Sequence, residues 1–180
     1  MSTATENLKN DHVHIIKITD IMEQVAQSKD PDIKHLETIL ELIKKFADGF
    51  HHAKEENLLF PLLGEKGFPK EQGPVAVMLH EHESGRNFVK NMSENINLYK
   101  KGDVTTISAI RENMLGYVNL LRNHIEKENN ILFRMADNVL DNNEQEVLLN
   151  QFEDIGNDLG SATIQNYLLQ IQNLSNAYNI

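Results

Sequence analysis

A ten-residue segment occurs twice in the sequence, as HHAKEENLLF at residues 51–60 and as HIEKENNILF at residues 124–133. Six positions are identical in the two copies, and each copy has a histidine followed four residues later by a glutamate. Residues i and i+4 lie one above the other on an α-helix, so each pair can direct two side chains at one point. The fold must accommodate two such helices. The pairs are His51 with Glu55 and His124 with Glu128.

Helix signals run through the whole chain, whereas the alternation of β-branched or aromatic residues that predicts strands is nearly absent. Thr3 and Glu6 form a capping pattern at the start of the first helix. Turn-forming stretches rich in Gly, Pro, Asn and Asp separate the later helices. We expect six helices, at about residues 3–25, 31–64, 74–100, 104–140, 143–159 and 162–177. Four long helices with short connections predict an all-α, up-down-up-down four-helix bundle, followed by two short C-terminal helices.

A chain of 180 residues is long enough for one domain with a sizeable core. We expect residues 1–140 to form the bundle and residues 141–180 to form a C-terminal helical extension. The apolar residues of this extension fit two interpretations equally well. The extension packs on the bundle, or it forms the face of a homodimer.

Composition excludes several classes of function. The net charge of -10 disfavours nucleic acid, because phosphate binding requires clustered Lys and Arg. No apolar run approaches the length of a membrane span, and the N-terminal residues lack the features of a secretory signal, so we expect a cytoplasmic protein. The chain has no cysteine, so a metal ion would be held by histidines and carboxylates.

Each repeat is preceded by a further histidine on the previous helix, and each of these histidines follows an acidic residue: Asp11-His12 and Glu81-His82. The chain therefore contains two copies of a unit, a helix with one histidine followed by a helix with His-x-x-x-Glu. Antiparallel helices joined by short loops would bring the six side chains to one level of the bundle. The candidate metal ligands are His12, His51, Glu55, His82, His124 and Glu128.

The predicted inward face of the fourth helix supports a metal site. Glu128 shares this face with Tyr117, Leu121, Ile131 and Met135. A glutamate buried there alone would be costly, whereas one bound to a cation would not. Six ligands exceed the four of a structural zinc site and suit two ions with two bridging carboxylates and two histidines for each ion. Mixed imidazole and carboxylate ligation favours iron, with manganese or zinc possible.

The other histidines have weaker patterns. His52 forms a second possible pair with Glu56, but this pair shares its face with Lys45 and Asp48. We therefore expect His52 to face solvent or to support the ligands from outside. No ligand role is expected for the histidines that lack a partner pattern, which are His14, His35 and His80.

Tyr117 lies two turns before His124 on the same face of the fourth helix. Core packing is the favoured interpretation of this tyrosine, and contact with an open metal position is the alternative.

The segments DHVHI, FHHAKEENLLFPLL, GPVAVMLHEHESGR and LLRNHIEKENNILFRMAD resemble the four signature helices of the hemerythrin-like, or HHE cation-binding, family. The resemblance covers roughly residues 8–140. It implies a four-helix bundle with a non-haem di-iron centre, whose ligands would fall on the six candidates named above. Ferritin-like di-iron bundles match less well, because they use Glu-x-x-His, and none of the eight histidines here has a glutamate three residues before it.

The departures from oxygen-carrying hemerythrins bear on function. Those proteins have His-x-x-x-His on the third helix and His-x-x-x-x-Asp on the fourth, whereas here Arg86 stands four residues after His82 and the fourth helix has His-x-x-x-Glu. The resemblance thus implies one histidine ligand fewer and an open position at the ions, as in the branch linked to nitric oxide, peroxide and iron handling. We expect a centre that binds and reacts with O2, NO or H2O2. The alternatives are a non-enzymatic oxygen, iron or redox sensor and a reversible O2-binding protein.

Overall fold

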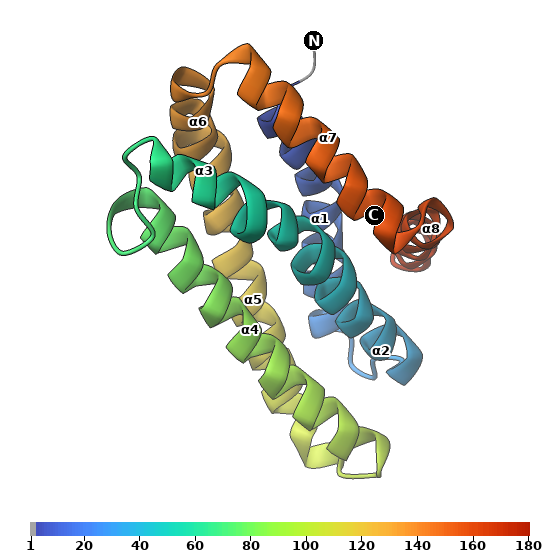
Figure 1. The fold of residues 1–180 in the computed structure, drawn as a ribbon. Helices are drawn as coiled ribbons and strands as arrows, with labels where there is room; N and C mark the ends of the chain where they lie inside the picture. Colours follow the sequence, from blue (N-terminus) through green and yellow to red (C-terminus); the bar gives the residue numbers. More distant parts are fainter. Residues whose placement is uncertain (1–2) are drawn as a thin grey trace.

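A computed structural model describes residues 3–180 and shows four long helices in this part of the chain (Figure 1). The first and third are α1 (Ala4–Gln27) and α4 (Gly73–Lys100). The second and fourth contain π-helical stretches. The label η marks these stretches and also one 3-10 turn. The second consists of α2 (Ile33–Leu42), η1 (Ile43–His52), η2 (Glu55–Leu59) and α3 (Phe60–Glu65). The fourth follows a 3-10 turn, η3 (Val104–Thr106), and consists of α5 (Ile107–Lys127), η4 (Glu128–Leu132) and α6 (Phe133–Val139).

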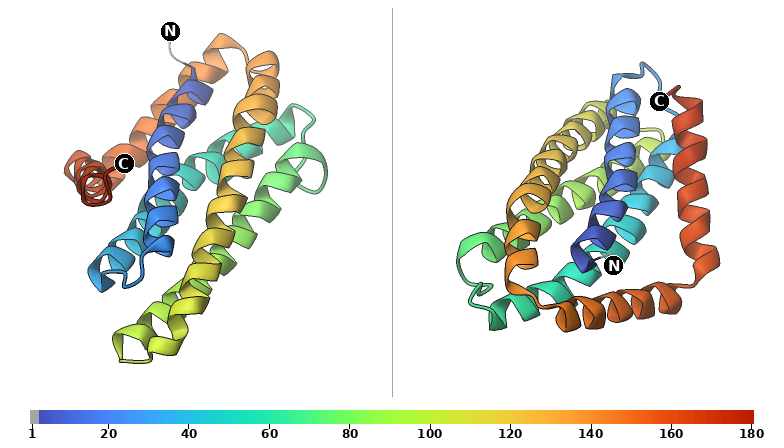
Figure 2. Two further views of the ribbon diagram at one scale, coloured as in Figure 1. Left: turned by 180° about the vertical axis from the view of Figure 1, so that it is seen from behind. Right: turned by 90° about the horizontal axis from the view of Figure 1, so that it is seen from above.

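Consecutive long helices run in opposite directions, as Figures 1 and 2 show. The helix α5 packs along both α4 and α1. The sequence signals fix the helix ends: Thr3 and Glu6 form the predicted capping box at the start of α1, and Gly102, with φ of 100°, turns the chain after α4. The described residues contain no strand. The predicted all-α bundle is therefore confirmed.

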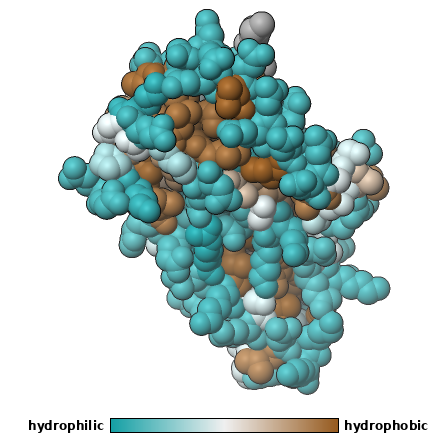
Figure 3. All heavy atoms as spheres, viewed as in Figure 1, coloured by the Kyte–Doolittle hydropathy of each residue, from teal (hydrophilic) through white to brown (hydrophobic). Residues whose placement is uncertain are grey.

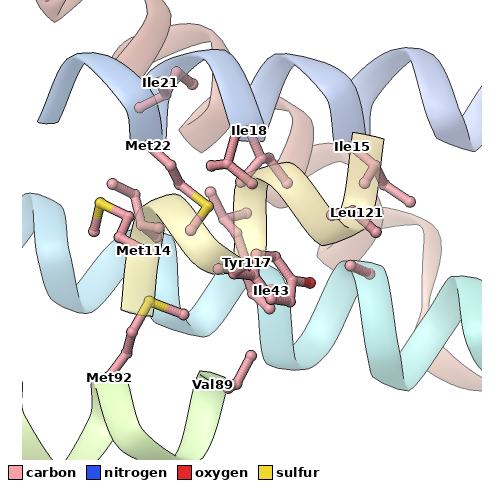
Figure 4. Packing of buried hydrophobic residues seen from close by; sticks show 14 of the residues in the cluster. Ile15, Ile18, Ile21, Met22, Ile43, Val89, Met92, Met114, Tyr117 and Leu121 are labelled. Atoms are coloured by element: carbon pink, nitrogen blue, oxygen red, sulfur yellow. The ribbon is translucent and has the colours of Figure 1, made fainter. Parts of the chain in front are cut away.

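Buried apolar residues form two clusters, one at each end of the bundle. The larger cluster includes Ile15, Met22 and Met114, and Figure 4 shows part of this cluster. The smaller cluster includes Leu8 and Phe133. Each fully buried aliphatic or aromatic side chain contributes about 1.5–3 kcal/mol. On α1, His12 lies between Leu8 of the smaller cluster and Ile15 of the larger one. The two clusters therefore enclose a polar level of the bundle.

Two further helices follow the bundle, α7 (Asn142–Leu159) and α8 (Ser161–Ala177). Phe152 of α7 belongs to the smaller cluster, and Ile171 and Leu174 of α8 belong to the larger one. Both helices contact α1, and Figure 2 shows them bent around one side of the bundle. The domain division at residue 140 and the homodimer face stay predictions. None of the described helices combines the length and apolar character needed to span a lipid bilayer.

The inward face of the fourth helix differs from the prediction after Glu128. Ile131, predicted to point inward, is 52% exposed, and Met135 is only half-buried. Leu132 and Phe133 are buried in their place. The reason is η4, because its i→i+5 hydrogen bonds place an extra residue in the turn and shift the inward face along the sequence.

Candidate metal centre

The structure brings all six predicted ligands together in the polar level between the two apolar clusters. Each is at most 2% exposed. They come from all four long helices, and the two glutamates are the first residues of π-helical stretches, Glu55 of η2 and Glu128 of η4. Single π-helical turns occur often at functional sites.

The histidines form two pairs. The Nε2 atoms of His12 and His51 are 3.0 Å apart, and those of His82 and His124 are also 3.0 Å apart. The two pairs lie side by side, with the carboxylates of Glu55 and Glu128 directed at both.

Each glutamate spans the two histidine pairs. Glu128 Oε2 is 3.3 Å from His12 Nε2, and its Oε1 is 3.2 Å from His124 Nε2. Glu55 Oε1 is 3.6 Å from His51 Nε2, and its Oε2 is 3.5 Å from His82 Nε2. This is the arrangement expected of two carboxylates that bridge two ions.

The other nitrogen of each ring, Nδ1, is held by an oxygen from a different long helix. The pairs are His12 with Asn129 (2.9 Å), His51 with Asp11 (3.3 Å), His82 with Glu56 (2.7 Å) and His124 with Glu81 (3.0 Å). Because ionised carboxylate and amide oxygens accept hydrogen bonds, Nδ1 donates, and the Nε2 atom of each neutral ring is left as a bare acceptor. Metal-bound histidines have the same outer hydrogen bonds.

With all four rings neutral, the form that binds metal, the centre contains acceptors that face one another without a donor. All four oxygens of Glu55 and Glu128 are buried and have no hydrogen-bond partner among the described residues. Buried polar atoms are normally paired, and the exceptions need an explanation. A cation explains both the orphaned oxygens and the paired Nε2 atoms, so the residues present fit a metal-binding site.

Electrostatics agree with this fit. Burial lowers the pKa values of His51 and His82 to about 4, so both rings are neutral at pH 7, the form that binds metal. Burial, and after it the nearby Glu128, raises the pKa of Glu55. Burial alone would lower the pKa of His124, but Glu128 and Glu81 raise it to about 9. Without a metal ion, a proton on His124 would have to balance the charge of Glu128.

The repeated lysine of the two copies acquires a role in this geometry. Lys54 Nζ lies 2.7 Å from Asp11 Oδ2, the acid that holds His51. Lys127 in the same way contacts Glu81, the acid that holds His124. The sequence shows an acid directly before each upstream histidine, but that adjacency alone predicts no partner for either acid. The shared lysine was the signal that could have supplied one.

The two lysines give a matched pair of variants. Lys54 is 2% exposed, whereas the side chain of Lys127 is 35% exposed. We expect Lys54→Met to lower the free energy of unfolding by about 3–5 kcal/mol, because it removes a buried, unscreened cation from Asp11, whose side chain is itself only 14% exposed. Lys127→Met should cost about 1 kcal/mol or less, because water already screens the charge of the exposed lysine, so its removal takes little from Glu81. Urea denaturation measures both values, and equal effects would contradict this account.

His52 does not face solvent, the first of its two expected positions, but lies where it can support the ligands from outside, the second. It is 7% exposed, and its ring stacks on that of His82 with centroids 3.7 Å apart and planes 12° apart. A ring nitrogen of His52 lies within 4.8 Å of ring nitrogens of His82 and His124. The reason is η1, whose wide turns bring the adjacent His51 and His52 both inward. Parallel stacked rings cannot both aim their lone pairs at one ion, so His52 lies beside the predicted ligand set.

A polar network surrounds His52. Asp48 Oδ1 is 3.0 Å from His52 Nδ1 and 2.8 Å from Arg86 Nη2, and Arg86 also bonds to Glu56 at 2.7 Å. The corresponding positions of the other repeat unit carry no charge. Those positions are Leu121, Ile125, Ile16 and Asn129. The two sides of the centre therefore differ, and the His82–His124 side is the more polar one.

A cavity of about 400 Å³ opens on this polar side, between η1, α4 and α5. Its lining includes His52, His82 and His124 but neither His12 nor His51. Figure 3 shows apolar atoms at the bottom of a hollow between hydrophilic side chains in this region. Tyr117 lines the cavity and also packs in the larger cluster, as favoured from the sequence.

The remaining histidines lie outside the cluster of six. His35 bonds through Nδ1 to the Tyr178 hydroxyl at 2.8 Å. His14 packs edge-on against Phe46, and His80 is exposed.

Comparisons with known proteins agree with the geometry. The family model described as Hemerythrin HHE cation binding domain matches residues 3–136. Among curated relatives, the iron-sulfur cluster repair protein YtfE of Edwardsiella ictaluri is 29% identical over 125 residues, which are 68% of this chain and 56% of that protein. The YtfE protein of Pectobacterium atrosepticum is 33% identical over 88 residues, 48% of this chain and 40% of that protein. The chain thus spans about half the length of these relatives or less. No solved structure matches the chain.

Proposed function

The chain belongs to the hemerythrin HHE cation-binding family, and from this premise we propose that it holds two iron ions and reacts there with a small oxidant such as O2, NO or H2O2. One observation carries the proposal: four imidazole nitrogens and four carboxylate oxygens, all buried, converge on one another, and the four oxygens have no hydrogen-bond partner among the described residues. Nitrogen and oxygen ligands in this mixture favour iron, with manganese or zinc possible.

The geometry suggests how the ligands would be shared. His12 and His51 would hold one ion, and His82 and His124 the other. Glu55 and Glu128 would each give one oxygen to each ion. Each ion would then have four protein ligands, fewer than the six of an octahedral site, so a position for an external ligand would remain.

The protein would contribute orientation, charge and exclusion of water. When bound, a pair of ferrous ions supplies two electrons to an oxidant, and a cellular reductant would restore them. The outer hydrogen bonds to Nδ1 keep the imidazoles neutral and fixed in direction. The buried carboxylates balance the charge of the ions, and the apolar clusters keep bulk water from the centre.

The alternative is a sensor or a reversible O2-binding protein at the same centre. The helices α7 and α8 favour a sensor, because both contact α1, which carries His12. The name of the relatives refers to iron–sulfur cluster repair. For this chain we propose only iron handling from that role.

Rapid mixing tests the proposed reaction. We expect O2 and H2O2 each to oxidise the reduced, iron-loaded protein when they are rapidly mixed with it. Ferric charge-transfer bands should appear in the optical spectrum, and no lasting oxygenated form should be seen. The physical reason is the open position next to two electron donors. Zinc-loaded protein is the control, because zinc has no redox chemistry. An oxygenated band that persists and disappears under vacuum would instead establish reversible O2 binding.

A further inference from the structure

The cavity beside the centre is larger than a diatomic oxidant requires. Its volume is about 400 Å³, whereas one water molecule occupies about 30 Å³ of liquid. Sites for small organic molecules have volumes of about 300–1,000 Å³. The space therefore suits an organic molecule better than O2, NO or H2O2 alone.

One wall of the cavity is apolar. It is formed by side chains from η1, α4 and α5, which are Ile43, Val89, Tyr117, Leu120 and Leu121. Figure 4 shows Val89 of α4 directed toward Tyr117 of α5 and Ile43. Gly85 also lines the cavity, and its missing side chain leaves space in front of the Tyr117 ring. This wall would bury the hydrocarbon part of a ligand.

Among the buried side chains of the lining, one hydrogen-bond acceptor and one donor have no protein partner. The Nδ1 atom of His52 is bonded to Asp48, so its Nε2 remains an acceptor. The hydroxyl of Tyr117 makes no hydrogen bond to another described residue, and burial raises its pKa, so it stays a neutral donor. O2 and NO have no proton to give to His52. A hydroperoxide group can donate its O–H proton and accept a hydrogen bond as well.

We propose that this cavity binds an organic hydroperoxide, with its apolar body against the aliphatic wall and its hydroperoxide group in contact with His52 and Tyr117, next to His82 and His124. The choice of a hydroperoxide as the reactive group of the ligand rests on the proposed dimetal function. The binding of the apolar part of the ligand rests only on the cavity. The ligand would thus approach the ion held by His82 and His124, because the cavity does not reach His12 or His51.

Calorimetric titration with cumyl alcohol tests the proposal. This alcohol is the inert product of cumene hydroperoxide and keeps both its aromatic body and an O–H group. The protein is used as purified, with its metal content measured. We expect saturable binding, and cumene hydroperoxide should compete for the same site in zinc-loaded protein.

Two variants locate the bound alcohol. Leu120→Trp fills the cavity, and we expect it to weaken binding by at least tenfold. Leu115→Trp on the same helix is the control, because Leu115 is 42% exposed and lies outside the cavity; its binding should match that of the unmodified protein. If Leu120→Trp does not fold, Gly85→Ala replaces it, since the added methyl would meet the Tyr117 ring at an acceptable 3.4 Å.

A third variant tests His52. The change His52→Phe keeps a ring stacked on His82 but removes the acceptor, so binding should weaken by about tenfold, the effect of one lost hydrogen bond. The metal content should stay unchanged. Loss of an ion would show that His52 is itself a ligand and would overturn its assigned role.

The remaining outcomes separate this proposal from the proposed function. Two ions with no alcohol binding, or equal binding in Leu120→Trp and the unmodified protein, would overturn the cavity proposal alone. Alcohol binding that Leu120→Trp abolishes, in protein that takes up no metal, would support the cavity and contradict the dimetal function.

Discussion

Replacing Glu128 with alanine is expected to remove at least one of the two metal ions from the purified protein. Glu128 faces both histidine pairs, at 3.3 Å from His12 and 3.2 Å from His124. Its loss therefore takes one oxygen from each proposed ion and leaves the histidine pairs without a shared anion. Elemental analysis after expression in iron-rich medium measures the result. Glu55→Ala should have the same effect, because Glu55 also faces both pairs.

The matched control is Glu56→Ala. Glu56 accepts hydrogen bonds from His82 and Arg86, but its carboxylate lies outside the group of converging acceptors. Removing such an outer partner costs about 10–100-fold in metal affinity, which saturating iron offsets, so two ions should remain. Equal losses from Glu55→Ala and Glu56→Ala would show that the ligand face is wrongly assigned. A single ion in the unmodified protein would contradict the dimetal centre itself.

Removing the metal should lower the melting temperature by about 10 °C or more. An ion that binds only the folded chain stabilises it by about 4 kcal/mol when present at 1,000 times its dissociation constant. In a domain of this size, 1 kcal/mol corresponds to about 2–4 °C. The metal-free centre would also retain unpaired buried acceptors, which add to the loss of stability.

Thermal melts with and without a chelator, after the metal content has been verified, measure this effect. The Glu128→Ala variant is the internal comparison, because a chelator should change its melting temperature less than that of the unmodified protein. An unchanged melt after complete metal removal would contradict the claim that the ions balance the buried acceptors.

The sequence was sufficient to predict the helices and the six converging residues. The spacing of His51 with Glu55, and of His124 with Glu128, places each pair on one helix face, and the repeat distinguishes His51 from its neighbour His52. Short connections then force the helices to alternate in direction. These inferences need only regular helix geometry.

Two expectations failed where the helix geometry is not regular. His52 does not face solvent, the first of its two expected positions, and Ile131 does not point inward, because His52 is buried and Ile131 is exposed. The second expected position of His52, in support of the ligands, agrees with its stacking on His82. His52 and Ile131 both lie in π-helical stretches. The regular period of an α-helix does not hold there, because each i→i+5 turn contains an extra residue. The local sequence pattern used here does not predict a π-helical turn.

The outer hydrogen bonds could not be predicted for another reason. The partner of each Nδ1 atom comes from a neighbouring helix, as Asp11 does for His51. The pairing depends on how the helices rotate about their axes, which only the packed structure determines. The cavity likewise results from packing, because its lining combines η1, α4 and α5.

The division of the ligands between the two helical hairpins has a consequence for the mechanics of the fold. His12 and His51 belong to the first hairpin, and His82 and His124 to the second, but each proposed ion also takes a carboxylate oxygen from the opposite hairpin. Each ion would therefore be a crosslink between the two halves of the chain, and neither half alone has the complete proposed ligand set. Such a crosslink limits how far the hairpins can separate in a partly opened molecule. Metal occupancy would then control the rate at which the bundle opens, as well as its reaction with oxidants.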